Sequence, residues 1–132
     1  MDTLLLQRAL DKAGPLFNAQ FVADGQEVLD YLQGDNRFGD RDQFPVPGLI
    51  ILDLKMPRLN GFDVLNWLKA QPRHCTTPVV ILSSSDDPSD VTRAYSLGAS
   101  TYLVKPPRSE DLHGLVRTFQ DYWIHYSRLP SN

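Results

Sequence analysis

The run Leu49-Ile50-Ile51-Leu52-Asp53 joins four aliphatic residues directly to a carboxylate, and the rest of the chain repeats this arrangement twice. Val79-Val80-Ile81-Leu82 is followed by Ser83, and Tyr102-Leu103-Val104 is followed by Lys105. Short, wholly apolar strands that alternate with helices are typical of a parallel sheet covered on both faces. The sequence therefore predicts an α/β fold with a polar side chain at the end of each strand.

Apolar residues at helical spacing predict the helices between and around these strands. Asn60 and Asp87 are expected to cap two of them. The polar connection 34–48 is long for a small domain and is expected to be functional or mobile; its Phe38 and Phe44 either dock a partner or fold back onto the domain. The predicted helices cover residues 2–13, a segment containing Val28, Leu29 and Leu32, and residues 61–70, 88–97 and 110–126; a further strand is predicted at 17–22.

The composition excludes several classes of protein. With 132 residues, 42% of them hydrophobic, the chain is expected to fold as one globular domain, 1–132. Its aliphatic runs of four residues fall far short of the roughly 20 that span a bilayer. The net charge of −3, without a basic stripe, argues against nucleic acid as a partner. A single cysteine, Cys75, fits a reducing cytoplasm. His74, His113 and His125 lack metal-ligand spacing and are expected at the surface.

The carboxyl ends of parallel strands are where such sheets bind ligands, so Asp53, Ser83 and Lys105 are expected to converge. A carboxylate can act as the nucleophile toward a phosphoryl group. A hydroxyl and an ammonium group can bind the phosphoryl oxygens. These residues therefore form a candidate phosphoryl site. The alternative is that each polar side chain only marks where a buried strand reaches water.

Three segments, 49–61, 78–85 and 98–106, resemble the three signatures of bacterial response-regulator receiver domains of the CheY-like type, in the same order and spacing. The resemblance covers essentially the whole chain. It is greatest to the small single-domain regulators that pair with phytochrome-type histidine kinases. It implies a flavodoxin-like, doubly wound parallel sheet and a cytoplasmic phosphoacceptor that is not an enzyme beyond weak autophosphatase activity.

The resemblance also implies a role for individual residues. Asp53 would accept the phosphoryl group from a kinase histidine, and Lys105 would pair with the resulting acyl phosphate. The backbone carbonyl of Lys55, with Asp53, would ligate Mg²⁺. Ser83 would be the hydroxyl switch residue.

Two further implications concern the last strand and its end. Tyr102 would be the rotating aromatic residue of the switch; the simpler interpretation is core packing with the hydroxyl at the rim. The Lys105–Pro106 peptide bond would be cis, although cis is a minority state for X–Pro bonds in general.

One departure from the family concerns the start of the chain. Receivers begin with an apolar strand that ends in two acidic residues, whereas Met1-Asp2 leads directly into a predicted helix. We therefore expect an N-terminally truncated receiver that lacks its usual first strand. Mg²⁺ binding and phosphotransfer are expected to be weak, since Mg²⁺ is usually held by one or two carboxylates. A neighbouring chain, direct pairing of the flanking strands, or residues outside this sequence would fill the gap.

Two functions from different classes remain open. The leading one is a phosphoacceptor in a two-component pathway, and the alternative is a pseudo-receiver that serves as a non-phosphorylated dimerisation or docking module. The last helix shows apolar residues on more than one side, including Tyr122 and Ile124, which predicts a homodimer. A phosphatase of the haloacid dehalogenase type is disfavoured. Proteins that resemble that class carry an Asp-x-Asp motif, and Lys55 stands at the position of its second aspartate.

Overall fold

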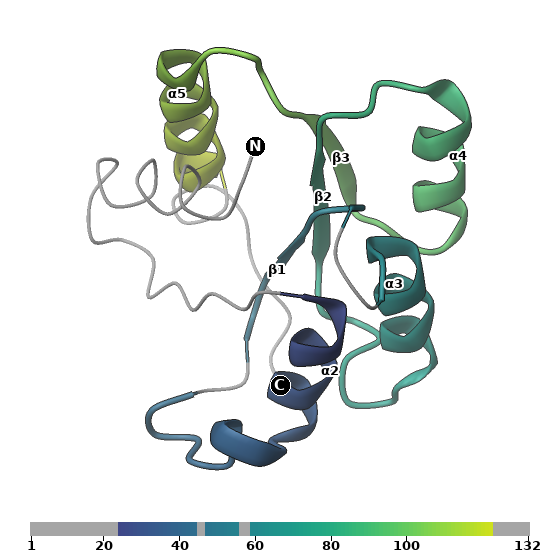
Figure 1. Cartoon of the computed structure of the whole chain (residues 1–132), viewed down its shortest axis with the longest axis vertical. Coiled ribbons are helices and arrows are strands. Elements are labelled where there is room, and N and C mark those ends of the chain that lie inside the picture. Colours follow the sequence, from purple (N-terminus) through teal and green to yellow (C-terminus); the bar gives the residue numbers. More distant parts are fainter. Residues whose placement is uncertain (1–23, 45–46, 56–58, 123–132) are drawn as a thin grey trace. The chain divides into compact units, whose positions relative to one another are not determined.

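The computed structural model describes residues 24–44, 47–55 and 59–122 (Figure 1). These residues belong to two compact units. We call residues 24–104 the sheet unit and residues 105–122 the carboxy-terminal unit. The predicted helix at 2–13, the predicted strand at 17–22 and the expected loss of the first strand lie outside the described residues. Within the described part of the chain, no helix is long and apolar enough to cross a membrane.

The sheet unit contains three parallel strands in the order β1-β2-β3. They are β1 (Ile50–Leu52), β2 (Val79–Ser83) and β3 (Thr101–Val104). All five residues of the central strand β2 are buried, as expected for a strand covered on both faces. The predicted α/β architecture with a parallel sheet is confirmed.

Three helices alternate with these strands: α2 (Gly25–Gln33), α3 (Gly61–Ala70) and α4 (Pro88–Ser96). Helices α3 and α4 lie on the same side of the sheet (Figure 1). The core between helices and sheet is mostly aliphatic, and its largest fully buried side chains come from α3, β1 and β2. They are Leu52, Val64, Leu65, Leu68, Val79 and Ile81.

Local capping chemistry fixes where two of these helices begin. The Asn60 side chain accepts a hydrogen bond from the Asp63 amide, and the Asp63 carboxylate accepts one from the Asn60 amide, which forms a capping box. Asp87 caps α4 by accepting from the Ser89 amide, and Pro88 occupies the first turn. Both predicted caps are confirmed.

The connection 34–48 contains the short 3-10 helix η1 (Asn36–Phe38). Phe38 is only 2% exposed and packs against Tyr31 and Phe44 at ring-centroid distances of 5.0 and 5.1 Å. We call Tyr31, Phe38 and Phe44 the aromatic cluster. The Arg41 guanidinium closes it by donating to the carbonyls of Leu32 and Phe44. Of the two alternatives for Phe38 and Phe44, the structure therefore supports folding back onto the domain.

His74 is buried, with 4% of its surface exposed, so its predicted surface position is wrong. Its ring stacks on that of Trp67 at 6.3 Å between centroids, and the backbone of Leu32 in α2 lies near it. Burial lowers the pKa of His74, and the nearby Arg73 and Arg41 lower it further. The correction has a physical reason: burial of this loop residue depends on α2, which is remote in sequence.

The carboxy-terminal unit contains α5 (Ser109–Gln120), and the predicted continuation of this helix beyond residue 122 lies outside the described residues. Leu112, Val116 and Phe119 are buried, whereas Tyr122 is 55% exposed. The Lys105–Pro106 bond is trans, because no cis peptide bond occurs among the described residues. The cis bond expected from the resemblance is thus corrected; the trans form is the one that X–Pro bonds favour intrinsically.

Candidate functional site

Asp53 follows β1 immediately and is half-buried. Its Oδ1 accepts a hydrogen bond from the backbone amide of Lys55 at 3.0 Å, which orients the carboxylate. Leu52 is the register partner of Ile81, so the residue after Leu52 lies beside the end of β2. Since adjacent strands are about 4.8 Å apart, the structure brings Asp53 to the same edge of the sheet as Ser83.

Gly61 holds the backbone of Asp53 against the start of α3. Its amide donates to the Leu54 carbonyl at 3.1 Å. A Cβ atom at position 61 would lie 2.5 Å from the Asp53 carbonyl oxygen and 2.9 Å from the Leu54 Cα. Both neighbours are backbone atoms that cannot rotate away. Glycine is therefore required here because the helix and the Asp53 loop approach so closely.

Ser83 ends β2 and is completely buried. Its Oγ accepts a hydrogen bond from the Ser85 amide at 3.2 Å, so the hydroxyl is tied to the loop that leads into α4. The register partner of Ser83 on β3 is Val104, and Lys105 is the next residue after that partner. Lys105 is half-exposed and is the first residue of the carboxy-terminal unit.

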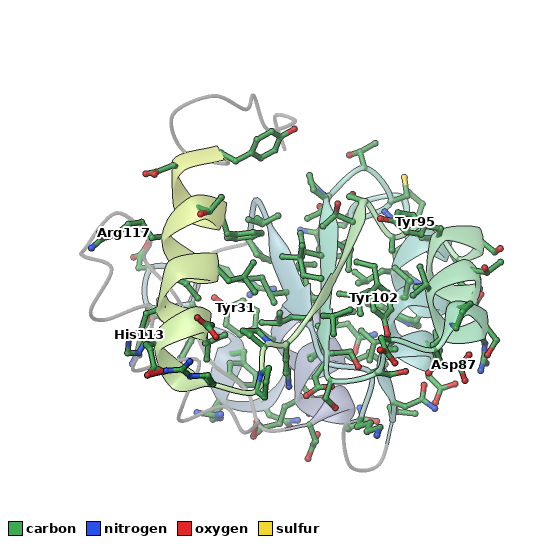
Figure 2. The ribbon with its side chains drawn as sticks, turned by 90° about the horizontal axis from the view of Figure 1, so that it is seen from above. Tyr31, Asp87, Tyr95, Tyr102, His113 and Arg117 are labelled. Carbon is green, nitrogen blue, oxygen red and sulfur yellow. The ribbon has the colours of Figure 1, made fainter. Side chains whose placement is uncertain are left out.

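Tyr102 shows the simpler of the two interpretations, core packing, and its role in a switch stays a prediction. Its ring packs against the hydrophobic core, while its hydroxyl donates to the Ser85 carbonyl at 2.8 Å. Its backbone amide donates to the Tyr95 hydroxyl of α4 at 3.1 Å. Tyr95 and Tyr102 are seen in Figure 2 between β3 and α4. The Tyr102 side chain is therefore linked to the loop after Ser83, and its backbone is linked to α4.

Ser85 was not singled out from the sequence, yet it contacts two of the predicted site residues, Ser83 and Tyr102. Besides Ser83 and Tyr102, it reaches Asp90 in the first turn of α4, with 2.7 Å between the Ser85 Oγ and the Asp90 Oδ2. At the same helix start, hydrogen bonds from the amide and hydroxyl of Ser89 lower the pKa of Asp87. The only sequence signal for Ser85 was its position two residues after Ser83.

The metal-binding capacity of the described residues is limited. No group of three or more His, Cys, Asp or Glu side chains gathers in residues 24–44, 47–55 and 59–122. The Asp53 carboxylate and the neighbouring Lys55 carbonyl are oxygen ligands of the kind that Mg²⁺ prefers. Because Mg²⁺ keeps several waters and binds phosphate oxygens, this pair fits a site that a phosphoryl group completes.

The chain matches the family described as the response regulator receiver domain over residues 3–117, a span that includes both units. Rcp1 of Synechocystis is 31% identical over 130 residues, which cover 98% of this chain and 86% of Rcp1. The solved response regulator RPA3017, from red light signalling in R. palustris, has a TM-score of 0.90 at 36% identity, covering 98% of this chain and 90% of that one.

The phosphorylated cyanobacterial phytochrome response regulator RcpA is also similar, with a TM-score of 0.86, 29% identity, and coverage of 98% of this chain and 94% of that one. The predicted likeness to small phytochrome-associated regulators is therefore confirmed. Receivers are signalling modules rather than conventional enzymes. From the three sequence signatures, the parallel sheet and these similarities, we conclude that the chain belongs to the response-regulator receiver domain family.

Proposed function

We propose that the chain is the phosphoacceptor of a two-component pathway and that Asp53 receives the phosphoryl group from a histidine kinase. The observation that carries this proposal is the placement of Asp53 at the carboxyl end of β1, oriented by the Lys55 amide, beside the strand that ends in Ser83. The similarity to the phosphorylated regulator RcpA supports it.

The proposed reaction is a single phosphoryl transfer. A carboxylate oxygen of Asp53 attacks the phosphorus of the kinase phosphohistidine, and a P–O bond forms as the P–N bond breaks. The electron pair of the broken bond stays on the imidazole nitrogen, which takes up a proton. The product is an acyl phosphate whose phosphoryl group carries about −1.5 to −2 charges where the carboxylate carried −1.

Two side chains are proposed to bind the transferred group. Lys105 would contribute a positive charge to the phosphoryl oxygens, and the Ser83 hydroxyl would donate a hydrogen bond to one of them. Ser83 is well suited to respond, because its Oγ already contacts the Ser85 amide. Tyr102 is proposed to follow this movement as the aromatic switch residue, since it contacts the same loop.

Mg²⁺ is proposed as the cofactor, with the Asp53 carboxylate and the Lys55 carbonyl as ligands. When bound, the ion would neutralise charge on the phosphoryl oxygens. Support comes from Rcp1, which has been solved in an Mn²⁺-bound form at a TM-score of 0.83, with 30% identity and coverage of 98% of this chain and 91% of that one.

The partner is proposed to be a phytochrome-type histidine kinase, because RcpA is a phytochrome response regulator and RPA3017 acts in red light signalling. We also propose a homodimer that uses the end of α5, where the large Tyr122 side chain is 55% exposed. Light scattering at tens of micromolar tests the second proposal, and a monomeric mass would contradict it.

The test of the phosphoacceptor is intact mass spectrometry after incubation with acetyl phosphate and Mg²⁺. We expect the wild type to gain one phosphoryl group and Asp53→Asn to gain none. Asp42→Asn is the matched control, because Asp42 is an exposed carboxylate in the connection 34–48. Equal uptake by Asp53→Asn would contradict the assignment of Asp53. No uptake by the wild type would contradict the phosphoacceptor and favour the docking module.

A further inference from the structure

We propose that Arg41 and His74 form a pH-sensitive latch, which holds the described part of the connection, residues 34–44, against α2 and releases it when His74 binds a proton. The latch lies at the amino end of β2, whereas Asp53 lies at the opposite edge of the sheet, so the proposal is independent of phosphorylation. Its parts come from three segments that are remote in sequence: the end of α2, the connection and the loop 71–78.

The Arg41 guanidinium fastens the connection to the end of α2. Its Nη1 donates to the Phe44 carbonyl and its Nη2 to the Leu32 carbonyl, each at 3.0 Å. Leu32 lies in the last turn of α2, where carbonyls lack a partner within the helix, and Arg41 satisfies one of them. Hydrogen bonds with a charged donor are stronger than those between neutral groups. Release of Arg41 would therefore free residues 34–44 and uncover the aromatic cluster.

Gly34, the residue after α2, leaves room for this guanidinium. Its φ of 73° lies in the left-handed region, which glycine adopts without strain. A Cβ atom at this position would lie 3.1 Å from the Arg41 Nη2 and 3.3 Å from its Cζ. The end of α2 is therefore shaped to accept the Arg41 side chain.

His74 brings a second basic group to the same part of α2. It is only 4% exposed, its ring stacks on Trp67 of α3, and the Leu32 backbone lies near it. Helices α2 and α3 lie side by side, so the loop that follows α3 reaches the end of α2 (Figure 1). Arg41 and His74 therefore approach the Leu32 backbone from two different segments.

The charges around His74 make this arrangement sensitive to protonation. Arg41 faces the imidazole from the connection and Arg73 faces it from its own loop, and both positive charges disfavour the imidazolium form. From α3, the Lys69 ammonium donates to two carbonyls of the same loop. From α2, the Leu32 backbone favours the charged form. A proton on His74 thus adds a positive charge to a buried site that is already basic.

Opening becomes more favourable when His74 takes up a proton. In the open state the ring reaches water, where the ordinary pKa of about 6.5 applies. The buried His74 Nδ1 and Thr77 Oγ1, to which the described residues offer no partner, then also gain hydrogen bonds to water. Because burial lowers the pKa of His74 in the closed state, the latch is fully closed above about pH 6.5 and opens more often as the pH falls.

The first experiment measures hydrogen exchange of the full chain as protection factors, which remove the intrinsic pH dependence of exchange. The probe is the Phe44 amide, which donates to the Asp40 carbonyl at 2.8 Å. Its protection factor should fall about threefold to tenfold between about pH 7.5 and about pH 5.5, since one proton is taken up on opening. Low urea should leave exchange at Phe44 unchanged and accelerate it at the amides of β2, because a local opening exposes little surface.

His74→Phe tests whether this residue takes up the proton. The variant keeps an aromatic ring against Trp67 and should abolish the fall in protection at Phe44. His113→Gln, in the carboxy-terminal unit, is the control and should retain the fall. A fall of less than about twofold in the wild type would overturn the proposal. A full fall in His74→Phe would overturn it equally.

The second experiment titrates the His74 ring by NMR and tests the part of Arg41. Arg41→Gln should raise the pKa of His74 toward 6.5, because proton uptake and opening are linked. Arg37→Gln is the matched control: the Arg37 guanidinium lies 4.4 Å from the Phe38 ring centroid and pairs with Glu27. Equal titration of His74 in the two variants would overturn the latch. This measurement decides the proposal even where His74→Phe fails to fold.

Discussion

The two ends of β2 are built by opposite physical means. At its carboxyl end lies what we call the polar rim, Asp53–Lys55 and Ser83–Asp90, where side chains contact one another through hydrogen bonds. At its amino end lies the loop 71–78, whose buried His74 stacks on Trp67 and lies near Arg41, the residue that closes the aromatic cluster. There the His74 Nδ1 and the Thr77 Oγ1 are buried, and the described residues offer them no hydrogen-bond partner.

This difference indicates a division of labour within the sheet unit. Buried aromatic and aliphatic groups contribute most of the favourable free energy of folding, because this free energy is proportional to the apolar area removed from water. Hydrogen bonds at a half-exposed rim contribute little net stability each, since water replaces them. The polar rim can therefore rearrange at low cost while the amino end of β2 keeps the unit folded.

The largest effect is expected from Phe38→Ala. Phe38 is 2% exposed and contacts both other rings of the aromatic cluster. Removing a buried aromatic side chain costs about 3–5 kcal/mol in the free energy of unfolding. Urea denaturation followed by tryptophan fluorescence measures it. Arg37→Ala is the control, because the Arg37 guanidinium stacks over the same ring from the exposed side. If Phe38→Ala lost no more free energy of unfolding than the control, the proposed division between a stabilising amino end of β2 and a polar rim would be wrong.

Local signals in the sequence predicted much of the fold. Helix α3 has the bounds expected for it, 61–70, because Asn60 and Asp63 define its start within three residues. The strands follow from uninterrupted aliphatic runs, and parallel pairing then places Asp53 near Ser83. These features depend on neighbours in the chain or on a general rule of sheet topology.

Features that depend on contacts between remote segments were missed. The burial of His74 beside Leu32 of α2 is one of them. The sequence left open whether Phe38 and Phe44 fold back onto the domain, and the contacts of these rings with each other and with Tyr31 answer that question. Ser85 was missed because serine is common in loops and its role depends on the exact path between β2 and α4. Periodicity and capping rules contain no information on such contacts.

The pH dependence of stability tests whether the buried His74 contributes to the stability of the amino end of β2. Because burial lowers the pKa of His74 below 6.5, the unfolded chain binds more protons than the folded one as the pH falls below 6.5. Stability should therefore be full above pH 6.5 and decrease below it, by at most about 1.4 kcal/mol per pH unit from this one group. Urea midpoints between about pH 5.5 and about pH 7.5 measure the slope.

His74→Phe keeps an aromatic ring against Trp67 and should reduce this slope, whatever it does to the stability at neutral pH. The groups that face His74 are Arg41 and Arg73, and both disfavour its protonation. His113→Gln in the carboxy-terminal unit is the control and should retain the slope. An unchanged slope in His74→Phe would mean that other groups cause the pH dependence of stability. His74 at the amino end of β2 would then not be its source.

The smallest effect is expected from Tyr95→Phe, at an exposed hydrogen bond between α4 and β3 outside the polar rim. This substitution removes the Tyr95 hydroxyl, which accepts a hydrogen bond from the Tyr102 amide at 3.1 Å; Tyr95 is 48% exposed. Because water can take the place of the hydroxyl, the loss in stability should be about 0.5 kcal/mol or less. Hydrogen exchange should nevertheless accelerate at the Tyr102 amide and remain unchanged at the amides of β2. A loss comparable to that of Phe38→Ala would show that exposed hydrogen bonds contribute as much to the fold as buried aromatic rings, and the proposed division would then fail.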